Sequence, residues 1–160
     1  MQKHPIQKRT NQKTKQVVEF GCGPARLAAR LLDQILPPTC AYLGVDQSAG
    51  MLARAAARLE RFAPRARVQQ LTGGDPCRFG RGLAAGSVDV VVSTYVLDIL
   101  SDADIASMLR ESHRLLRPGG VLCLTGLTFP QVFFIFLVVL FLDRAGPMLC
   151  TVFNTSPSPI

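Results

Sequence analysis

Two stretches decide the fold: Val17-Val18-Glu19-Phe20-Gly21-Cys22-Gly23-Pro24-Ala25 and, further along the chain, Leu43-Gly44-Val45-Asp46. Both contain a short apolar run typical of a buried strand. The two glycines that follow the first run allow a tight turn and let the backbone approach a ligand closely. Asp46 ends the second run, where a carboxylate can accept hydrogen bonds from both hydroxyls of a ribose. The pattern is typical of a nucleotide-cofactor site.

Strands and helices alternate along the rest of the chain. Apolar periodicity predicts strands over 16–20, 41–46, 66–71, 87–93 and 120–127, and helices over 24–36, 48–62 and 101–116. Ser48 stands where a helix N-cap is expected, and Ser101 with Asp104 resembles a capping box. Residues 72–86 are rich in glycine and predict a loop. This alternation predicts an α/β fold, a doubly wound parallel sheet between two layers of helices.

Ligands bind doubly wound sheets outside the carboxyl ends of the strands. The candidate residues that fall at those predicted ends are Glu19 with its glycines, Asp46, Asp75, and Ser93-Thr94-Tyr95. Their agreement carries more weight than either glycine or carboxylate motif alone.

The net charge of +7 is concentrated at the start of the chain. Residues 1–16 hold Lys3, Lys8, Arg9, Lys13 and Lys15 and no acid, so the remaining residues carry only +2. We interpret 1–16 as a basic disordered leader; a nucleic-acid arm or an organelle-targeting leader is the alternative. The rest of the chain gives no strong nucleic-acid signal.

The cysteines and histidines give no pattern of a metal or disulfide framework. Five scattered cysteines, an odd number, favour a reduced, cytoplasmic location, and no pair has metal-ligand spacing. His4 and His113 are the only imidazoles in the sequence. We therefore predict no metal site and no histidine-based catalytic triad.

The residue after the glycine turn argues against a dinucleotide. The dinucleotide fingerprint has a glycine or alanine three residues after the second glycine, and Arg26 stands there. A nicotinamide-dependent oxidoreductase is therefore the third-ranked hypothesis.

Five ordered blocks make a more specific match. They are Glu19-Phe20-Gly21-Cys22-Gly23, Gly44-Val45-Asp46-Gln47-Ser48 with Met51-Leu52, Gly74-Asp75, Ser87-Val88-Asp89-Val90-Val91, and Leu115-Leu116-Arg117-Pro118-Gly119-Gly120-Val121-Leu122. In this order they resemble the class I S-adenosylmethionine-dependent methyltransferases, over about residues 17–127. The resemblance implies a Rossmann-like fold, S-adenosyl-L-methionine as the cofactor, and methyl transfer to a small-molecule acceptor.

The resemblance also assigns cofactor-binding residues. It implies that Glu19 and the backbone of Gly21, Cys22 and Gly23 line the methionine end, and that Asp46 holds the ribose hydroxyls. Met51 would lie near the adenine, Asp75 would accept from the adenine amino group, and Ser93 and Thr94 would border the sulfonium. Gln47 and Pro76 complete the predicted set. It identifies no catalytic residue, and methyl transfer requires alignment and water exclusion more than acid–base groups.

Two residues depart from the family's pattern. Ala25 occupies a position at which the family usually has a third glycine. If the backbone there has positive φ, alanine is strained and cofactor affinity should fall. Asp98 stands where many relatives carry histidine, so the resemblance supplies no base at that position.

The end of the chain does not follow the resemblance, which implies further helix and then two antiparallel strands. Instead, residues 132–142 form an unbroken apolar run, too short for a membrane-spanning helix, which needs about twenty residues. The alternatives are a buried strand or helix, a translated intron beginning at Gln131-Val132, and a transmembrane helix. Sequencing the transcript across codons 131 and 132 tests the translated-intron alternative. We divide the chain into the leader 1–16, the methyltransferase domain 17–130, expected to lack the family's last strands, and the apolar segment 131–160.

Because the end of the chain does not follow the family resemblance, a second function is left open. An incomplete or non-catalytic cofactor-binding domain could use the apolar segment as an interaction tail. Membrane contact through 132–142 is less favoured, and the sequence does not indicate an oligomeric state.

Overall fold

A computed structural model describes residues 15–73, 75, 78–128, 134–142 and 149–155, with side chains described up to residue 126. It contains one sheet of seven strands in the order β3-β2-β1-β4-β5-β6-β7. The strands are β1 (Gln16–Phe20), β2 (Ala41–Asp46), β3 (Ala66–Gln70), β4 (Val88–Thr94), β5 (Leu116–Thr128), β6 (Phe134–Leu142) and β7 (Leu149–Thr155). Strands β1 to β5 pair in parallel, and β6 pairs antiparallel with both β5 and β7.

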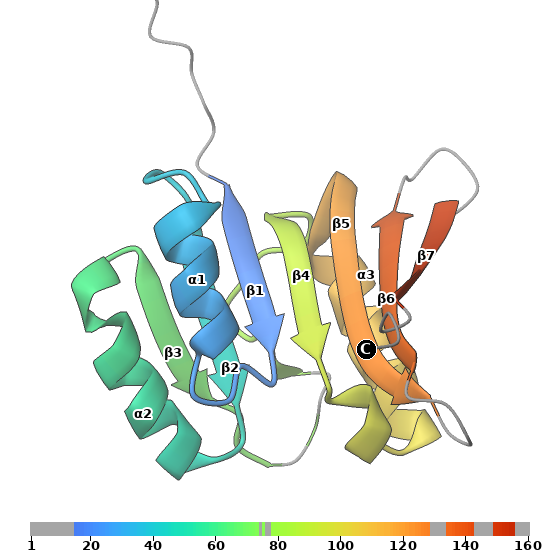
Figure 1. Ribbon diagram of the computed structural model, residues 1–160, viewed down its shortest axis with the longest axis horizontal. Coiled ribbons are helices and arrows are strands. Elements are labelled where there is room, and N and C mark those ends of the chain that lie inside the picture. The colour runs from blue at the N-terminus through green and yellow to red at the C-terminus, as the bar shows by residue number, and fades with distance from the viewer. Residues whose placement is uncertain (1–14, 74, 76–77, 129–133, 143–148, 156–160) are drawn as a thin grey trace, which may run out of the picture.

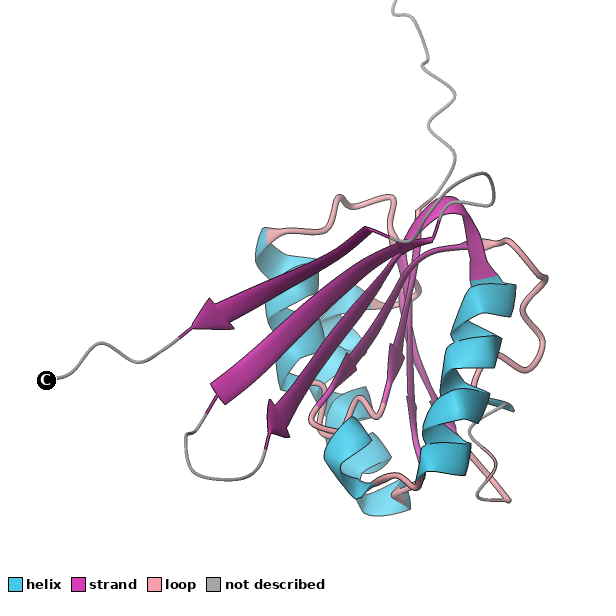
Figure 2. Cartoon of the chain, turned by 90° about the vertical axis from the view of Figure 1, so that its right-hand side faces the viewer, coloured by secondary structure: helices cyan, strands magenta, loops and turns pink. Residues whose placement is uncertain are grey.

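Helices cover both faces of the sheet, as the alternation predicted. Helices α1 (Arg26–Gln34) and α2 (Ala49–Leu59) lie on one face, and α3 (Asp102–Leu115) lies on the other (Figures 1 and 2). Two short 3₁₀ helices, η1 (Glu60–Phe62) and η3 (Leu97–Ile99), join these elements. The winding reverses between β1 and β4, which are neighbours in the sheet, so a crevice is expected at their carboxyl ends.

Two apolar cores hold the layers together. One joins α1 and α2 to the sheet and includes Val17, Ala28 and Leu59. The other joins α3 to the opposite face and includes Val18, Val91 and Met108. Neighbouring residues of β1 enter different cores because successive side chains of a strand point to opposite faces.

Both predicted helix caps form. The Ser48 hydroxyl oxygen accepts a hydrogen bond from the Met51 N–H at 3.3 Å. At α3 the Ser101 hydroxyl accepts from the Asp104 N–H at 3.2 Å and donates to the Asp104 carboxylate at 2.7 Å. Each cap fixes a helix N-terminus beside the carboxyl ends of the strands.

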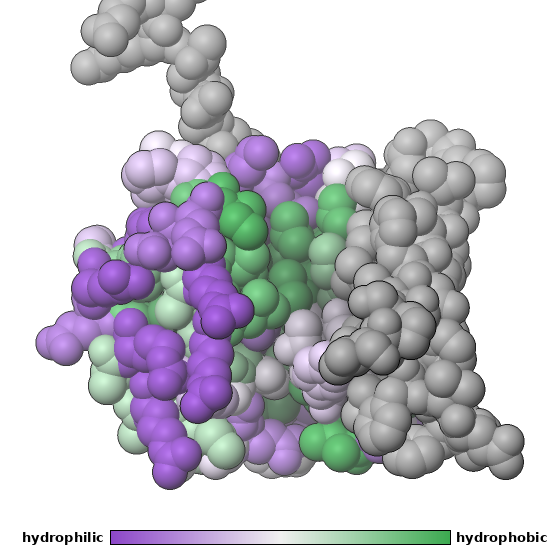
Figure 3. Space-filling model, viewed as in Figure 1, coloured by the Kyte–Doolittle hydropathy of each residue, from purple (hydrophilic) through white to green (hydrophobic). Residues whose placement is uncertain are grey.

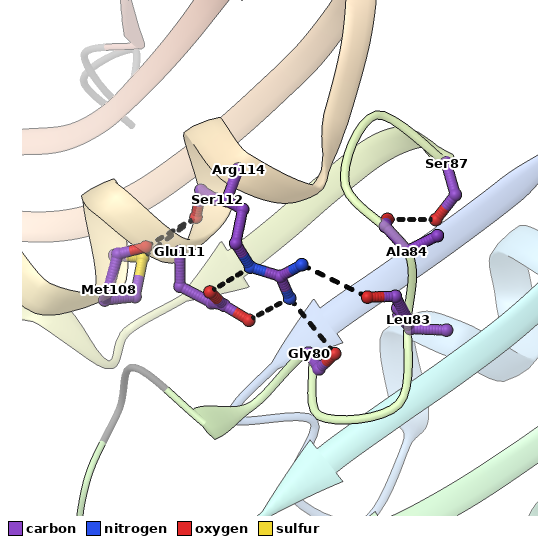
Figure 4. Close-up of polar contacts among 8 residues, drawn as sticks. All are labelled: Gly80, Leu83, Ala84, Ser87, Met108, Glu111, Ser112 and Arg114. Atoms are coloured by element: carbon purple, nitrogen blue, oxygen red, sulfur yellow. Dashed lines mark hydrogen bonds and ion pairs between the residues drawn. The ribbon is translucent and has the colours of Figure 1, made fainter.

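The loop between β3 and β4 is attached to α3 by Arg114 (Figure 4). The Arg114 guanidinium donates to both oxygens of Glu111, at 2.7 and 2.6 Å, and to the carbonyls of Gly80 and Leu83 at 3.3 and 3.2 Å. A side chain at Gly80 would collide with Leu115 and Glu111, so glycine permits this close approach. These contacts hold the loop against α3.

The last two strands correct the expectation from the sequence. We expected the domain to lack the family's last strands, whereas β6 and β7 extend the sheet beyond β5. An apolar run rich in phenylalanine, valine and leucine suits a strand, and it pairs with β5 from Gly120 to Thr128. The transmembrane-helix alternative is wrong for residues 134–142, which form a strand; none of the described helices is long and apolar enough to cross a bilayer. The translated-intron alternative is not tested by this arrangement.

The face that carries α1 and α2 is unevenly covered. Hydrophilic residues gather over the two helices, whereas apolar residues are visible beside α1, over the middle strands (Figure 3). Val90 of β4 and Cys123 of β5 are only partly buried there. The described helices therefore cover the β1–β3 half of this face more fully than β4 and β5.

Candidate functional site

A pocket of about 700 Å³ lies at the carboxyl ends of β1, β2 and β4, where the sheet topology places a ligand site. One side comprises Gly21, Gly23, Asp46, Gln47, Ser48 and Met51. The other side follows β4 and comprises Thr94, Tyr95, Val96, Ile99, Leu100 and Asp104. Phe20, Val45 and Leu71 complete the lining. Its size lies within the range of about 300–1,000 Å³ that is usual for small-molecule sites.

The glycine turn is fastened to the end of β2. The N–H groups of Gly21 and Cys22 both donate to the Val45 carbonyl, at 2.8 and 3.1 Å. Gly21 and Gly23 have positive φ angles, 73° and 51°, which side chains of L-residues rarely tolerate. The sequence therefore needs glycine at both positions to bring β1 into α1 beside the pocket.

Ala25 has a positive φ angle, the condition under which we expected alanine to be strained. Its φ and ψ angles are 55° and 39°, in the left-handed region, and it is the N-cap of α1. An L-residue with a Cβ atom costs roughly 1–2 kcal/mol in this conformation. The Ala25 side chain is fully buried among α1 and α2 residues, so packing offsets part of this strain. A resulting loss of cofactor affinity stays a prediction.

The Asp46 carboxylate joins the glycine turn to the residues that begin α2. One carboxylate oxygen accepts from the Gly23 N–H at 2.8 Å, and the other accepts from the Ser48 N–H at 2.8 Å. Both bonds orient the carboxylate at the pocket wall, between the glycine turn and the start of α2. Carboxylate oxygens have further lone pairs, so each can accept another hydrogen bond from a ligand hydroxyl.

Glu19 lies buried beside the pocket rather than in its lining. Its carboxylate accepts a hydrogen bond from the Tyr42 hydroxyl at 2.6 Å. Gly44 makes room for this contact, because a Cβ there would come within 2.8 Å of the Tyr42 hydroxyl. Burial raises the pKa of Glu19 to about 7; the Tyr42 hydrogen bond opposes this rise and the Asp46 charge adds to it. The same burial, with the Glu19 charge, raises the pKa of Tyr42.

Cys22 is a packing residue of the turn. Its side chain is buried, and burial together with the charges of Glu19 and Asp46 raises the pKa of the thiol to about 12. A thiol in this state is a poor nucleophile at neutral pH because the thiolate is the reactive form. In the part of the chain that the structure describes, no group of three or more histidine, cysteine or acidic residues could hold a metal ion.

The structure brings six of the eleven predicted cofactor residues into the pocket lining: Gly21, Gly23, Asp46, Gln47, Met51 and Thr94. Glu19, Cys22 and Ser93 are buried and do not line it. Asp75 is also absent from the lining and forms an ion pair with Arg78 at 3.5 Å. Pro76 lies outside the described residues. The roles implied for these five stay predictions.

Sequence reasoning missed most of the side that follows β4. Ile99, Leu100 and Asp104 line the pocket, although none was a predicted site residue. Tyr95 also lines it, and the sequence placed it among the residues at the predicted strand ends without giving it a cofactor role. A signal was present, because the apolar residues Val96, Ile99 and Leu100 continue past the predicted end of the strand at helical spacing. Asp98, which stands where many relatives carry histidine, is exposed and does not line the pocket.

Replacing Ser93 with alanine is expected to leave the free energy of unfolding unchanged or to raise it by up to about 1 kcal/mol. The Ser93 hydroxyl is fully buried and has no hydrogen-bond partner among the described residues, and burying an unpaired polar group is costly. Ser112→Ala is the matched control, because that hydroxyl is equally buried but donates to the Met108 carbonyl at 2.8 Å. Urea unfolding measures the free energy of unfolding of both variants. A larger loss of that free energy for Ser93→Ala than for Ser112→Ala would contradict the expectation.

Comparisons with known proteins agree with this geometry. A family model described as a methyltransferase domain matches residues 18–122. An arsenite methyltransferase from Aquipseudomonas alcaligenes is 40% identical over 110 residues, covering 67% of this chain and 31% of the relative. A trans-aconitate 2-methyltransferase from Deinococcus radiodurans is 36% identical over 107 residues, covering 67% of this chain and 36% of the relative.

A solved structure supports the fold. Phosphoethanolamine N-methyltransferase 1 from Haemonchus contortus, in complex with phosphoethanolamine and S-adenosylhomocysteine, matches with a TM-score of 0.61 at 23% identity. The match covers 74% of this chain and 23% of that chain. The chain thus spans about a third of the length of the two curated relatives described above.

Proposed function

Because the chain belongs to the class I S-adenosylmethionine-dependent methyltransferases, we propose that it binds S-adenosyl-L-methionine in the pocket at the glycine turn and transfers its methyl group to a small-molecule acceptor. The observation that carries the proposal is the meeting of Gly21, Gly23, Asp46 and Met51, predicted from separate motifs, in one pocket.

The residues present suit this cofactor chemically. The Asp46 carboxylate can accept hydrogen bonds from hydroxyl groups, and the half-exposed Met51 side chain offers apolar surface to a base. At Gly23 a Cβ would meet no atom within 4 Å, so the backbone borders open space that a ligand can fill. Among the described lining residues the only charged side chains are acidic, which suits a cofactor that carries a sulfonium.

The chain's own contribution to the reaction is orientation and water exclusion. When bound, the cofactor supplies an electrophilic methyl group on sulfur, and its transfer to a nucleophilic acceptor atom leaves a neutral thioether. Asp46 and the glycine turn fix one end of the pocket, and the apolar residues Tyr95, Val96 and Leu100 shield the other. Holding two reactants in line lowers the entropic cost of the displacement without an acid or base.

Asp46→Asn is expected to weaken S-adenosylhomocysteine binding by about tenfold to a hundredfold, because hydrogen bonds to a charged acceptor contribute roughly 1.5–3 kcal/mol each. Isothermal titration calorimetry measures the change. Asp33→Asn is the matched control, since Asp33 is a half-exposed acid on α1 paired with Arg61, away from the pocket. Equal affinities of the two variants would contradict the assignment of Asp46.

Thermal melting separates the proposed function from its alternatives. A ligand at about 100 times its dissociation constant stabilises a protein by roughly 2.7 kcal/mol. We expect S-adenosylmethionine and S-adenosylhomocysteine to raise the melting temperature and NAD to leave it unchanged. No shift with either sulfur ligand would overturn the proposal. A shift without methyl transfer to any acceptor tested would favour a non-catalytic cofactor-binding domain.

A further inference from the structure

The side of the pocket that follows β4 has an unusual concentration of exposed apolar surface. The described residues include four exposed large apolar side chains, and three of them, Met51, Tyr95 and Ile99, line this one pocket. Ile99 is 81% exposed and Tyr95 is 49% exposed. Exposed apolar side chains that gather at one place are typical of a binding surface, whereas scattered ones need no explanation.

The backbone at Tyr95 is strained, and a hydrogen bond holds it. Its φ angle is 58°, in the left-handed region, where a bulky residue is a rare outlier. The Tyr95 N–H donates to the Thr125 carbonyl of β5 at 2.7 Å, which fixes the turn at the end of β4. Strain of this kind persists where the surroundings impose it and is frequent at ligand sites. A glycine would suit the turn better, so the tyrosine ring has a use other than local stability.

The charge of the lining is of one sign. Asp46 and Asp104 are the acidic residues of the lining, and no lysine, arginine or histidine is among the described lining residues. The Asp104 carboxylate accepts from the Ser101 hydroxyl at 2.7 Å, which holds it at the start of α3. A ligand anion would meet two carboxylates and no cation. A ligand cation would meet those carboxylates and the aromatic ring of Tyr95, and cations are attracted to the faces of such rings.

We propose that Tyr95, Ile99 and Asp104 form the acceptor subsite, and that it takes a small apolar molecule carrying an amine rather than a carboxylate or a phosphate. The apolar body lies against Tyr95 and Ile99, and the amine lies on the side of Asp104. This inference rests on the proposed function, because it assigns the Asp46 side of the same pocket to the cofactor. It also separates this chain from relatives whose names specify anionic substrates.

Benzylamine and benzoate are suitable probes, because they share one ring and differ in charge. NMR titration of the full chain, with and without saturating S-adenosylhomocysteine, gives their dissociation constants. We expect benzylamine to bind at least tenfold more tightly than benzoate. Equal binding, tighter binding of benzoate, or no binding of benzylamine in either condition would overturn the inference. Binding of S-adenosylhomocysteine is measured separately, so failure of the acceptor subsite and failure of the cofactor site are distinguishable.

Tyr95→Gly separates a binding role from a structural one. Glycine accepts the positive φ angle, so the melting temperature is expected to stay the same or rise, whereas benzylamine binding is expected to weaken at least fivefold. Tyr95→Phe keeps the ring and should retain most of the affinity. Unchanged benzylamine binding in Tyr95→Gly would overturn the assignment of Tyr95. Asp104→Asn preserves a hydrogen-bond acceptor for Ser101. It should reduce the ratio of the benzoate dissociation constant to the benzylamine dissociation constant.

Discussion

Gly21→Ala is expected to lower the free energy of unfolding by about 2–5 kcal/mol, more than Gly23→Ala in the same turn. Two costs add. The φ angle of 73° is unfavourable for an L-residue by roughly 1–2 kcal/mol, and forcing a methyl group into a packed site costs about 1–3 kcal/mol. The second cost arises because a Cβ at Gly21 would fall inside the contact distance of the Val96 Cγ2 atom.

Gly23→Ala supplies the control for the backbone cost alone. Gly23 also has a positive φ angle, 51°, but a Cβ there would meet no atom within 4 Å. Its cost should therefore be only about 1–2 kcal/mol. Guanidinium unfolding followed by circular dichroism measures both variants. Equal costs for the two alanine substitutions would contradict the proposed contact.

A double-mutant cycle with Val96→Ala tests the contact directly. Removing the Val96 methyl groups gives an alanine at position 21 the space that it lacks in the wild type. The added cost of Gly21→Ala should then fall toward the backbone cost of about 1–2 kcal/mol. If the cost is the same in both backgrounds, Val96 is not what requires glycine at this position.

The stability of the wild type is expected to fall, relative to Glu19→Gln, by about 3 kcal/mol as the pH rises from about 4.5 to 7.5. Burial raises the pKa of Glu19 in the folded protein to about 7 from its ordinary value of 4.5. Between these values the folded state binds more protons than the unfolded state, so stability declines with rising pH. Each pKa unit corresponds to about 1.36 kcal/mol. The stabilisation is complete below the unfolded pKa and is lost as the pH rises through the folded pKa.

Glutamine is the matched replacement because its carbonyl oxygen can still accept the hydrogen bond from Tyr42. Urea unfolding at intervals of half a pH unit gives the difference between wild type and variant, from which titrations common to both cancel. A difference that stays constant between pH 4.5 and 7.5 would contradict the raised pKa. Tyr42→Phe removes the hydrogen bond that favours the carboxylate, so it should move the decline to higher pH.

A neutral Glu19 has a consequence for ligand binding. The group lies beside Asp46, and a cationic cofactor in the pocket would favour the charged form of the Glu19 carboxylate. If the cofactor binds as proposed, binding near pH 7 should therefore release protons from the protein. Calorimetry in buffers of different ionisation enthalpy detects such a release.

Local patterns were sufficient to predict much of the fold. Strands β1 and β2 have the predicted bounds, and Ser48 and Ser101 cap the predicted helices. These features depend on residues a few positions apart, whose spacing decides strand, helix or cap. The positive φ angle at Ala25 was raised only as a condition, from the glycine that the family usually has there, and the structure meets that condition.

The site was predicted less completely because its lining depends on contacts between distant parts of the chain. Tyr95 and Ile99 face the pocket only because β4 lies beside β1 in the sheet. The unbroken apolar run at 132–142 has no period that distinguishes a strand from a helix, and pairing with β5 decided that residues 134–142 form a strand.

By itself, the sequence determined the order of strands and helices, the glycine turn, and the position of Asp46 at the end of β2, because each depends on the local backbone and on apolar periodicity. Only the tertiary structure decided that Glu19 turns away from the pocket lining to Tyr42 and that Val96 lies against Gly21. Those contacts join residues from separate strands and loops. They exist only once the sheet has brought these elements together and excluded water from between them.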